Sequence, residues 1–377
     1  MRSRVVIDLD AIRHNVAALT ERASGGAAVM AVVKADGYGH GLVPSARAAV
    51  SGGASWLGVA FLAEALELRA AGIGVPILAW LTSPDEDLAP AIAAGVDLGV
   101  YDEAELAAVA SAAGRAGRSA RVHLKADTGL SRGGAPSAAW PQLCTAAAKA
   151  EAGGEVEAVG VWSHFAFADG GPDHPVNARQ TEVFHRALET ATKAGLQPQV
   201  RHLANSAATL LAPDTHFDLV RPGLAVYGLS PVPGVGAPAD FGLRPAMTLA
   251  SSVAFTKRVP AGSGVSYLHR YSTTAETTLA LVPLGYADGV PRGATNAAEV
   301  LLGGVRRRVA GTVCMDQFVL DCGDDPVAAG DDVLLFGPGS HGEPTAQEWA
   351  ERLDTISYEV VTRIGSRVPR VFVGSES

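Results

Sequence analysis

The chain has 377 residues, which is enough for one large domain and a smaller one, since domains commonly span about 100–200 residues. Hydrophobic residues make up 48% of the chain and charged residues 18%, a composition that supports a sizeable core and excludes intrinsic disorder. The 39 acidic residues exceed the 30 basic ones, and the basic residues cluster only at 306–308, so nucleic acid is not an expected partner.

The sequence also argues against a membrane or secreted protein. No run of about 20 apolar residues is free of Gly, Pro or charge. The basic N-terminus is followed by Asp8 and Asp10, which interrupt any signal-peptide core. Three cysteines, Cys144, Cys314 and Cys322, indicate neither a disulfide framework nor a metal site. We therefore expect a cytoplasmic protein without a metal.

From about residue 27 to 230, short apolar runs alternate with alanine-rich amphipathic segments such as 103–115 and 178–194. The predicted strands are 27–33, 54–60, 75–81, 96–101, 120–125, 156–163, 199–204 and 218–227. Eight such units predict an α/β fold, the (β/α)8 TIM-type barrel. A doubly wound open sheet is the alternative, but residues 34–41 lack the GxGxxG spacing of its usual phosphate loop.

After about residue 235 the pattern changes to β segments punctuated by Pro and Gly, with few helical stretches. The predicted segments are 247–256, 278–283, 305–311, 317–321 and 332–336. We expect a barrel domain over 10–235, followed by a mainly β C-terminal domain over 236–377 that includes a strand at 4–9.

Lys34 is the first candidate for chemistry. It follows an apolar run and precedes a glycine-rich turn, so it would lie at a rigid strand end in a pocket that disfavours the ammonium form. Such a lysine can act as a nucleophile or base. The alternative is a structural lysine paired with Asp36.

Residues 31–41, with the sequence AVVKADGYGHG, resemble the pyridoxal-phosphate attachment motif of the alanine racemases. Six further parts match that family in order: 122–132, 163–169, 202–207, 217–229, 265–267 with 285–289, and 313–318 with Tyr358. The resemblance covers about residues 4–372 and implies a (β/α)8 barrel followed by a β domain.

The resemblance also implies the cofactor, pyridoxal 5'-phosphate, and the residues that hold it. Lys34 would bind it covalently, and Arg132 would contact its phenolic oxygen and the substrate carboxylate, as a fork of N–H donors suits. The remaining cofactor-binding residues would be Tyr38, His164, Asn205, Ser206, Arg221, Gly223, Leu224 and Tyr358. Of these, the turns at Asn205, Ser206, Gly223 and Leu224 offer amides and a hydroxyl to the phosphate.

Arg221 matches the arginine that faces the pyridine nitrogen. An arginine does not readily release its proton, so it leaves that nitrogen unprotonated and weakens the ring as an electron sink. This favours proton return over transamination. The alternative for Arg221 is a structural salt bridge with Asp218.

Racemisation needs one base on each face of the α-carbon. In the family these are the cofactor lysine and a tyrosine, here Lys34 for the D-enantiomer and Tyr267 for the L-enantiomer. A tyrosine titrates near about 10, so Tyr267 needs positive surroundings, which the family supplies through His164 and Arg221.

The family places the β domain of one subunit at the barrel of the other, so a homodimer is implied. This would bring Met315 to the substrate carboxylate, with Asp316 beside it. Tyr286 would limit side-chain size at the entry. Lys125 matches a lysine that some members carry as a carbamate beside Arg132.

Three positions depart from the pattern of many relatives: Asp36-Gly37, Leu130-Ser131 and Leu268. The expected function is an isomerase that interconverts L-alanine and D-alanine, a small-molecule substrate, for peptidoglycan. The alternatives are a racemase of broader or serine-type specificity, a decarboxylase of the same fold, and a non-catalytic cofactor carrier.

Overall fold

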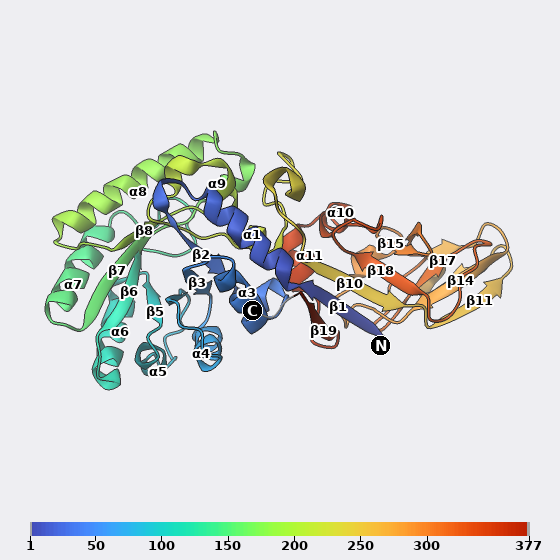
Figure 1. Cartoon of the computed structure of the whole chain (residues 1–377), viewed down its shortest axis with the longest axis horizontal. Helices are drawn as coiled ribbons and strands as arrows, with labels where there is room; N and C mark the ends of the chain where they lie inside the picture. The colour runs from blue at the N-terminus through green and yellow to red at the C-terminus, as the bar shows by residue number, and fades with distance from the viewer. Residues whose placement is uncertain (1, 375–377) are drawn as a thin grey trace. The chain divides into compact units, whose positions relative to one another are not determined.

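The computed structural model describes residues 2–374, which fall into two compact units (Figure 1). The barrel unit comprises residues 12–37 and 42–243, and the β unit comprises residues 2–11, 38–41 and 244–374. None of the described helices combines the length and apolar character needed to cross a membrane.

The barrel unit contains eight parallel strands. They are β2 (Ala28–Val32), β3 (Trp56–Val59), β4 (Ile77–Ala79), β5 (Asp97–Val100), β6 (Ala120–Lys125), β7 (Val156–Trp162), β8 (Val200–His202) and β9 (Leu219–Val220). Their order is β8-β7-β6-β5-β4-β3-β2-β9, and backbone bonds from Asp218 N to Arg201 O (3.1 Å) and from Arg221 N to Ala204 O (2.9 Å) join β9 back to β8. The predicted barrel is confirmed, and the open-sheet alternative is wrong.

Helices follow most strands, and Figure 1 places α4 to α8 around the outside of the sheet. The helices are α1 (Leu9–Arg22), α3 (Leu42–Ser51), α4 (Leu62–Ala70), α5 (Ala89–Ala93), α6 (Glu103–Ala116), α7 (Trp140–Ala152), α8 (Pro175–Lys193) and α9 (Ser206–Leu211). Local sequence defines α6: the Asp102 side chain accepts from Glu105 N at its start, and Gly117 ends it at φ +68°.

The β unit holds a six-stranded sheet in the order β16-β15-β18-β10-β1-β19, with β1 at Ser3–Asp8. Its other strands are β10 (Met247–Ser252), β15 (Glu299–Leu302), β16 (Val305–Arg308), β18 (Asp332–Phe336) and β19 (Arg370–Val373). Smaller sheets pair β11 (Phe255–Val259), β14 (Thr277–Val282) and β17 (Phe318–Asp321), and β12 (Gly264–Val265) with β13 (Tyr271–Ser272). Two short helices, α10 (Ala346–Arg352) and α11 (Ser357–Thr362), complete the unit.

Several predicted strands are longer than the observed ones, and two differ most. The strand expected at 218–227 ends at Val220, because Pro222 cannot donate to a ladder and a 3-10 turn follows at Leu224–Tyr227. The segment expected at 247–256 divides into β10 and β11, which pair with different sheets. The strands β15 and β19 and the helices α10 and α11 were not predicted.

Candidate active site

One residue separates Lys34 from the end of β2, and Lys34 begins the short helix α2 (Lys34–Tyr38), which is left-handed at its centre. Ala35, Asp36 and Gly37 have φ of +53°, +55° and +60°, and each non-glycine residue there costs about 1–2 kcal/mol. The Glu64 carboxylate stabilises the turn by accepting from Ala35 N (2.6 Å) and Ala60 N (3.0 Å). Asp36 accepts from Leu42 N (2.8 Å), so its carboxylate anchors the turn.

Four cationic side chains follow or end strands of the barrel unit: Lys34, Lys125, Arg132 and Arg221. Burial, and then the charge of Arg132, lowers the pKa of Lys34, while Glu64 raises it. Burial, and then the charges of Arg132 and Arg221, lowers the pKa of Lys125 to about 8. So many cations at one end of a barrel create a strongly positive site that suits an anionic ligand.

Aromatic rings surround Lys125. Its Nζ lies 4.8 Å from the ring centroid of Tyr101 and 4.6 Å from that of Trp162. Trp162 also stacks on the ring of His202 at 5.6 Å, and the Arg221 guanidinium lies 5.1 Å from the Trp162 centroid. These rings limit the access of water to Lys125 and Arg221.

Arg221 is buried and held entirely by neutral groups. Its Nη1 donates to His202 Nδ1 (3.1 Å), and its Nη2 donates to Ser163 O (2.7 Å) and His164 Nδ1 (3.1 Å). Asp218 pairs instead with Arg201 (2.6 Å), so the alternative of an Arg221–Asp218 salt bridge is wrong. Burial lowers the pKa of Arg221 to about 9, and burial with the neighbouring cations holds the pKa of His164 well below its ordinary value.

Ser206 links two turns of the barrel unit. Its buried hydroxyl oxygen accepts from Gly223 N (2.8 Å) and Ala225 N (3.3 Å), which leaves the hydroxyl hydrogen for another acceptor. Asn205 caps α9 by accepting from Ala208 N (3.0 Å), and Leu224 is buried beside the second turn. The Ser206 hydroxyl hydrogen is therefore the donor at these turns that suits a phosphate oxygen, since the Gly223 and Ala225 amides donate to Ser206 itself.

Arg132 differs from the other three cations because it is exposed, and its side chain forms no hydrogen bond within residues 2–374. Its five N–H donors are therefore available to an acceptor. The buried donors and the four cations together fit an anionic cofactor and a substrate carboxylate.

In the β unit, Tyr267, Tyr286 and Met315 are exposed by 70%, 45% and 53%. Hydrogen bonds connect the backbones of Tyr267 and Tyr286 to the segment 312–314, which precedes Met315. Tyr267 O accepts from Thr312 Oγ1 (2.8 Å), and Tyr286 N donates to Cys314 O (3.0 Å). All three side chains therefore lie outside the core of the β unit.

Left-handed backbone presents Tyr267. Ser266, Leu268 and His269 have φ of +60°, +63° and +44°. The Ser266 hydroxyl donates to Thr312 O (2.6 Å) and holds this turn in place. Strained backbone of this kind is common at functional sites.

The remaining expected site residues also lie in the β unit. Asp316 accepts from Arg367 Nη2 (2.6 Å). Tyr38 is buried, and its ring centroid lies 6.0 Å from that of the half-buried Tyr358 on α11. Burial raises the pKa of Tyr38, so its phenol remains protonated and able to donate.

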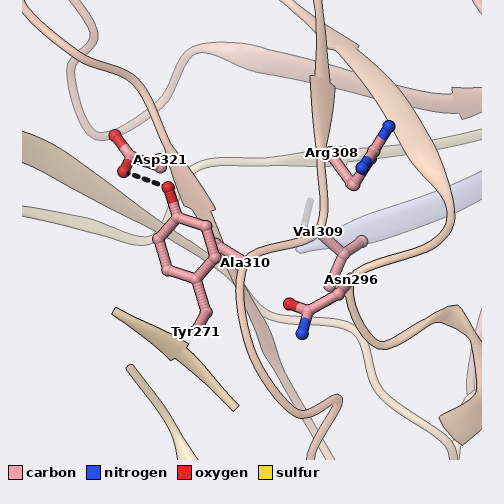
Figure 2. A pocket seen from close by; sticks show the side chains of 6 residues that line it. All are labelled: Tyr271, Asn296, Arg308, Val309, Ala310 and Asp321. Atoms are coloured by element: carbon pink, nitrogen blue, oxygen red, sulfur yellow. Dashed lines mark hydrogen bonds between the residues drawn. The ribbon is translucent and has the colours of Figure 1, made fainter. Parts of the chain in front are cut away.

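The β unit also contains a cavity of about 390 Å³ lined by Tyr271, Asn296, Arg308, Val309, Ala310 and Asp321 (Figure 2). The Tyr271 hydroxyl donates to Asp321 Oδ2 (2.6 Å) at its wall. None of the site residues expected from the sequence lines it. Within residues 2–374, no three or more His, Cys, Asp or Glu side chains group as metal ligands.

The sequence interpretation missed Trp162 and the polar residues Asp97 and His123, which lie on strands β5 and β6. A signal was present for Asp97, which is the one charged residue in the predicted strand 96–101. Asp97 is 1% exposed and His123 is 0% exposed. Buried polar groups of this kind require partners.

Two family models, a curated relative and a solved structure that are similar to this chain all belong to the alanine racemases. Residues 7–231 match the family model for the alanine racemase N-terminal domain, and residues 246–372 match that for the C-terminal domain. An alanine racemase from Frankia casuarinae is 67% identical over 99% of this chain and 97% of its own length. The crystal structure of alanine racemase from Streptomyces lavendulae has a TM-score of 0.98 at 55% identity, covering 100% of this chain and 98% of that one.

Proposed function

Because the chain belongs to the alanine racemase family, we propose that it interconverts L-alanine and D-alanine with pyridoxal 5'-phosphate as its cofactor. The observation that carries the cofactor assignment is the group of four cations at the strand ends, in which burial and Arg132 lower the pKa of Lys34. A lysine with a lowered pKa is the amine that carbonyl cofactors require.

Each cofactor contact has a chemical counterpart among the residues. Lys34 Nζ would hold the aldehyde, Arg221 would hold the ring nitrogen and Arg132 the phenolic oxygen, and His164 contacts Arg221. The phosphate contacts are Tyr38, Asn205, Ser206, Gly223, Leu224 and Tyr358. When bound, the cofactor withdraws electrons from the α-carbon of the amino acid and so acidifies its hydrogen.

The protein then moves the proton with two bases. Lys34 Nζ removes it from D-alanine or returns it on that face, and Tyr267 Oη does the same for L-alanine. Arg132 and the Met315 backbone hold the substrate carboxylate. Asp316 positions this segment through its contact with Arg367, and Tyr286 limits the substrate side chain.

We further propose that residues 10–235 form the cofactor domain, and that residues 236–377 with strand 4–9 serve the barrel of a second copy in a homodimer. The support is the exposure of Tyr267 and Leu268, at 70% and 76%. Large side chains this exposed are typical of residues that a partner covers.

Lys125 is proposed to carry a carbamate. Because its pKa is lowered to about 8, part of the amine is unprotonated near neutral pH and can add CO2. The resulting negative charge would offset the repulsion between Lys125 and Arg132. We place the enzyme in the cytoplasm, where it supplies D-alanine for peptidoglycan.

The decisive experiment compares Tyr267→Phe with the native chain. Purified native protein should be yellow and should racemise alanine. Tyr267→Phe should slow α-hydrogen exchange of L-alanine more than that of D-alanine, because only one face loses its base. Equal losses for the two enantiomers would contradict the two-base assignment. Racemisation rates for a small panel of amino acids, including serine, measure the substrate specificity.

Mixing two inactive variants tests the shared site. Lys34→Ala and Tyr267→Phe each lose one base. If each site combines residues from two chains, mixed dimers regain one intact site and part of the activity. Each variant refolded alone is the control, and no recovery on mixing would argue against the dimer proposal.

A further inference from the structure

A continuous chain of buried hydrogen bonds leads away from Arg221 through the interior of the barrel unit. Arg221 Nη1 contacts His202 Nδ1 (3.1 Å), His202 Nε2 contacts His123 Nδ1 (2.8 Å), and His123 Nε2 contacts Asp97 Oδ2 (3.2 Å). We call Asp97, His123 and His202 the relay. Its members are all 1% exposed or less.

The relay joins the two ends of the strands. Asp97 is the first residue of β5, His202 is the last residue of β8, and Arg221 directly follows β9. Since the strands are parallel, the carboxylate lies toward the end opposite the cations. Arg121 fixes it there with a bond from Nε to Asp97 Oδ1 (2.8 Å).

The backbone makes room for the relay. His123 and His202 lie on strands that flank β7, and His123 is in register with Gly160 of β7. A Cβ at Gly160 would lie 2.3 Å from His123 Nδ1, so only glycine leaves space for the imidazole. The β6–β7 register shifts at this point, an irregularity that re-aims side chains.

The chemistry at the two ends allows one direction for every bond. Arg221 can only donate, so His202 Nδ1 must accept and His202 must carry its proton on Nε2. His202 then donates to His123 Nδ1, which places the His123 proton on Nε2, where the ionised Asp97 accepts it. Because Arg221 can only donate and the ionised Asp97 can only accept, both imidazoles carry their hydrogen on Nε2.

Arg221 has no carboxylate in direct contact, although a buried guanidinium without an anion is costly. Although burial opposes ionisation, hydrogen bonds from His123 and Arg121 hold the pKa of Asp97 below its ordinary value. Burial, and then the charge of Arg221, holds the pKa of His202 well below its ordinary value, so this ring is neutral. The nearest anion along the hydrogen bonds is thus Asp97.

We propose that Asp97, acting through His123 and His202, is a positioning residue for Arg221: the relay fixes both imidazoles in one tautomer and holds the guanidinium in one orientation toward the cofactor site. This inference rests on the proposed function, because it gives the orientation of Arg221 its purpose. In a Ser-His-Asp triad, a buried carboxylate orients one catalytic histidine in the same way; here two imidazoles lie between the carboxylate and the group that it orients.

Neutron diffraction from crystals of the full chain loaded with pyridoxal phosphate tests the tautomers directly. We expect a hydrogen on Nε2 and none on Nδ1 in both His123 and His202. A hydrogen on either Nδ1 would overturn the proposal. This result does not depend on any variant or on turnover, so it stands even if the native chain fails to racemise alanine, an outcome that would refute only the proposed function.

Kinetics of two variants test the effect on Arg221. His123→Phe keeps a ring but breaks the relay, and we expect kcat for alanine to fall about tenfold with KM within about twofold. His123→Gln restores a donor and an acceptor and should recover kcat to within about threefold of native. The control is His14→Phe, which loses a bond to Gly242 O (2.9 Å) outside the relay. Native kcat in His123→Phe, or no recovery in His123→Gln, would overturn the proposal.

Discussion

Gly285 offers a sharp test of the proposed substrate side of the site. A Cβ built there would lie 2.3 Å from both Cys314 O and Met315 O. These are backbone atoms, so no side-chain rotation relieves the clash. The carbonyl of Cys314 also accepts from Tyr286 N (3.0 Å), and therefore Gly285→Ala must displace Met315 and Tyr286 together.

The size of the effect follows from the geometry. To reach an ordinary contact, the 314–315 backbone must move by about 1 Å, a displacement that typically costs about 100-fold in rate. Overpacking of this kind also destabilises a fold by about 1–3 kcal/mol. We expect kcat/KM for alanine to fall about 100-fold, with the urea midpoint lowered by the same strain.

The matched control is Gly365→Ala. A Cβ at Gly365 meets Ala287 O at 3.7 Å and Asp288 O at 3.8 Å, which are ordinary contacts. Steady-state racemisation, measured in both directions, should separate the two variants clearly. If Gly285→Ala retains kcat/KM within twofold of Gly365→Ala, the placement of Met315 and Tyr286 at the substrate is refuted.

Further predictions concern the barrel unit. Ser206→Ala leaves the amides of Gly223 and Ala225 without their acceptor and removes a donor to the phosphate. We expect the affinity for pyridoxal phosphate, measured by equilibrium dialysis, to fall about tenfold or more, and the Tm, measured by calorimetry, to drop. Unchanged affinity would remove Ser206 from the phosphate site. For Lys125, burial and the neighbouring cations hold the pKa at about 8 in the folded chain, below its ordinary value of 10.5. The unfolded chain therefore holds the extra proton between these values, and native stability should rise with pH across that window. Urea unfolding of cofactor-free protein at pH 7 and pH 9.5 should show a larger rise in the native chain than in Lys125→Met, where the lowered pKa of Lys34 still contributes. Equal rises would contradict the lowered pKa of Lys125, and native mass spectrometry identifies any carbamate. Ala35→Gly should be neutral or stabilising by up to about 1 kcal/mol, because relief of the left-handed strain exceeds the entropy cost of glycine; a clear loss in the same assay would argue against that strain.

The barrel could be predicted because its signal is local. Short β-type runs alternate with longer amphipathic segments, and β6 has the bounds that this pattern predicts; in the β unit, β18 does too. The errors occur where partner choice matters: β10 and β11 form one apolar segment, and only their different partners divide them.

The candidate site was predictable where a motif carries it, as at Lys34 and Arg221. The roles assigned to these residues remain predictions, because the structure describes positions and contacts. The relay was not predicted, since Asp97, His123 and His202 are far apart in sequence and nothing in the local pattern shows that their side chains meet.

The sequence by itself determined the alternation of strands and helices, the family, and which residues could carry the chemistry, because these depend on local pattern and side-chain type. Only the tertiary structure decided which groups meet. Parallel strands bring four cations to one end of a barrel, and Gly160 lets His123 and His202 meet across β7. The closed sheet thereby connects Arg221 to a carboxylate that the order of residues along the chain does not reveal.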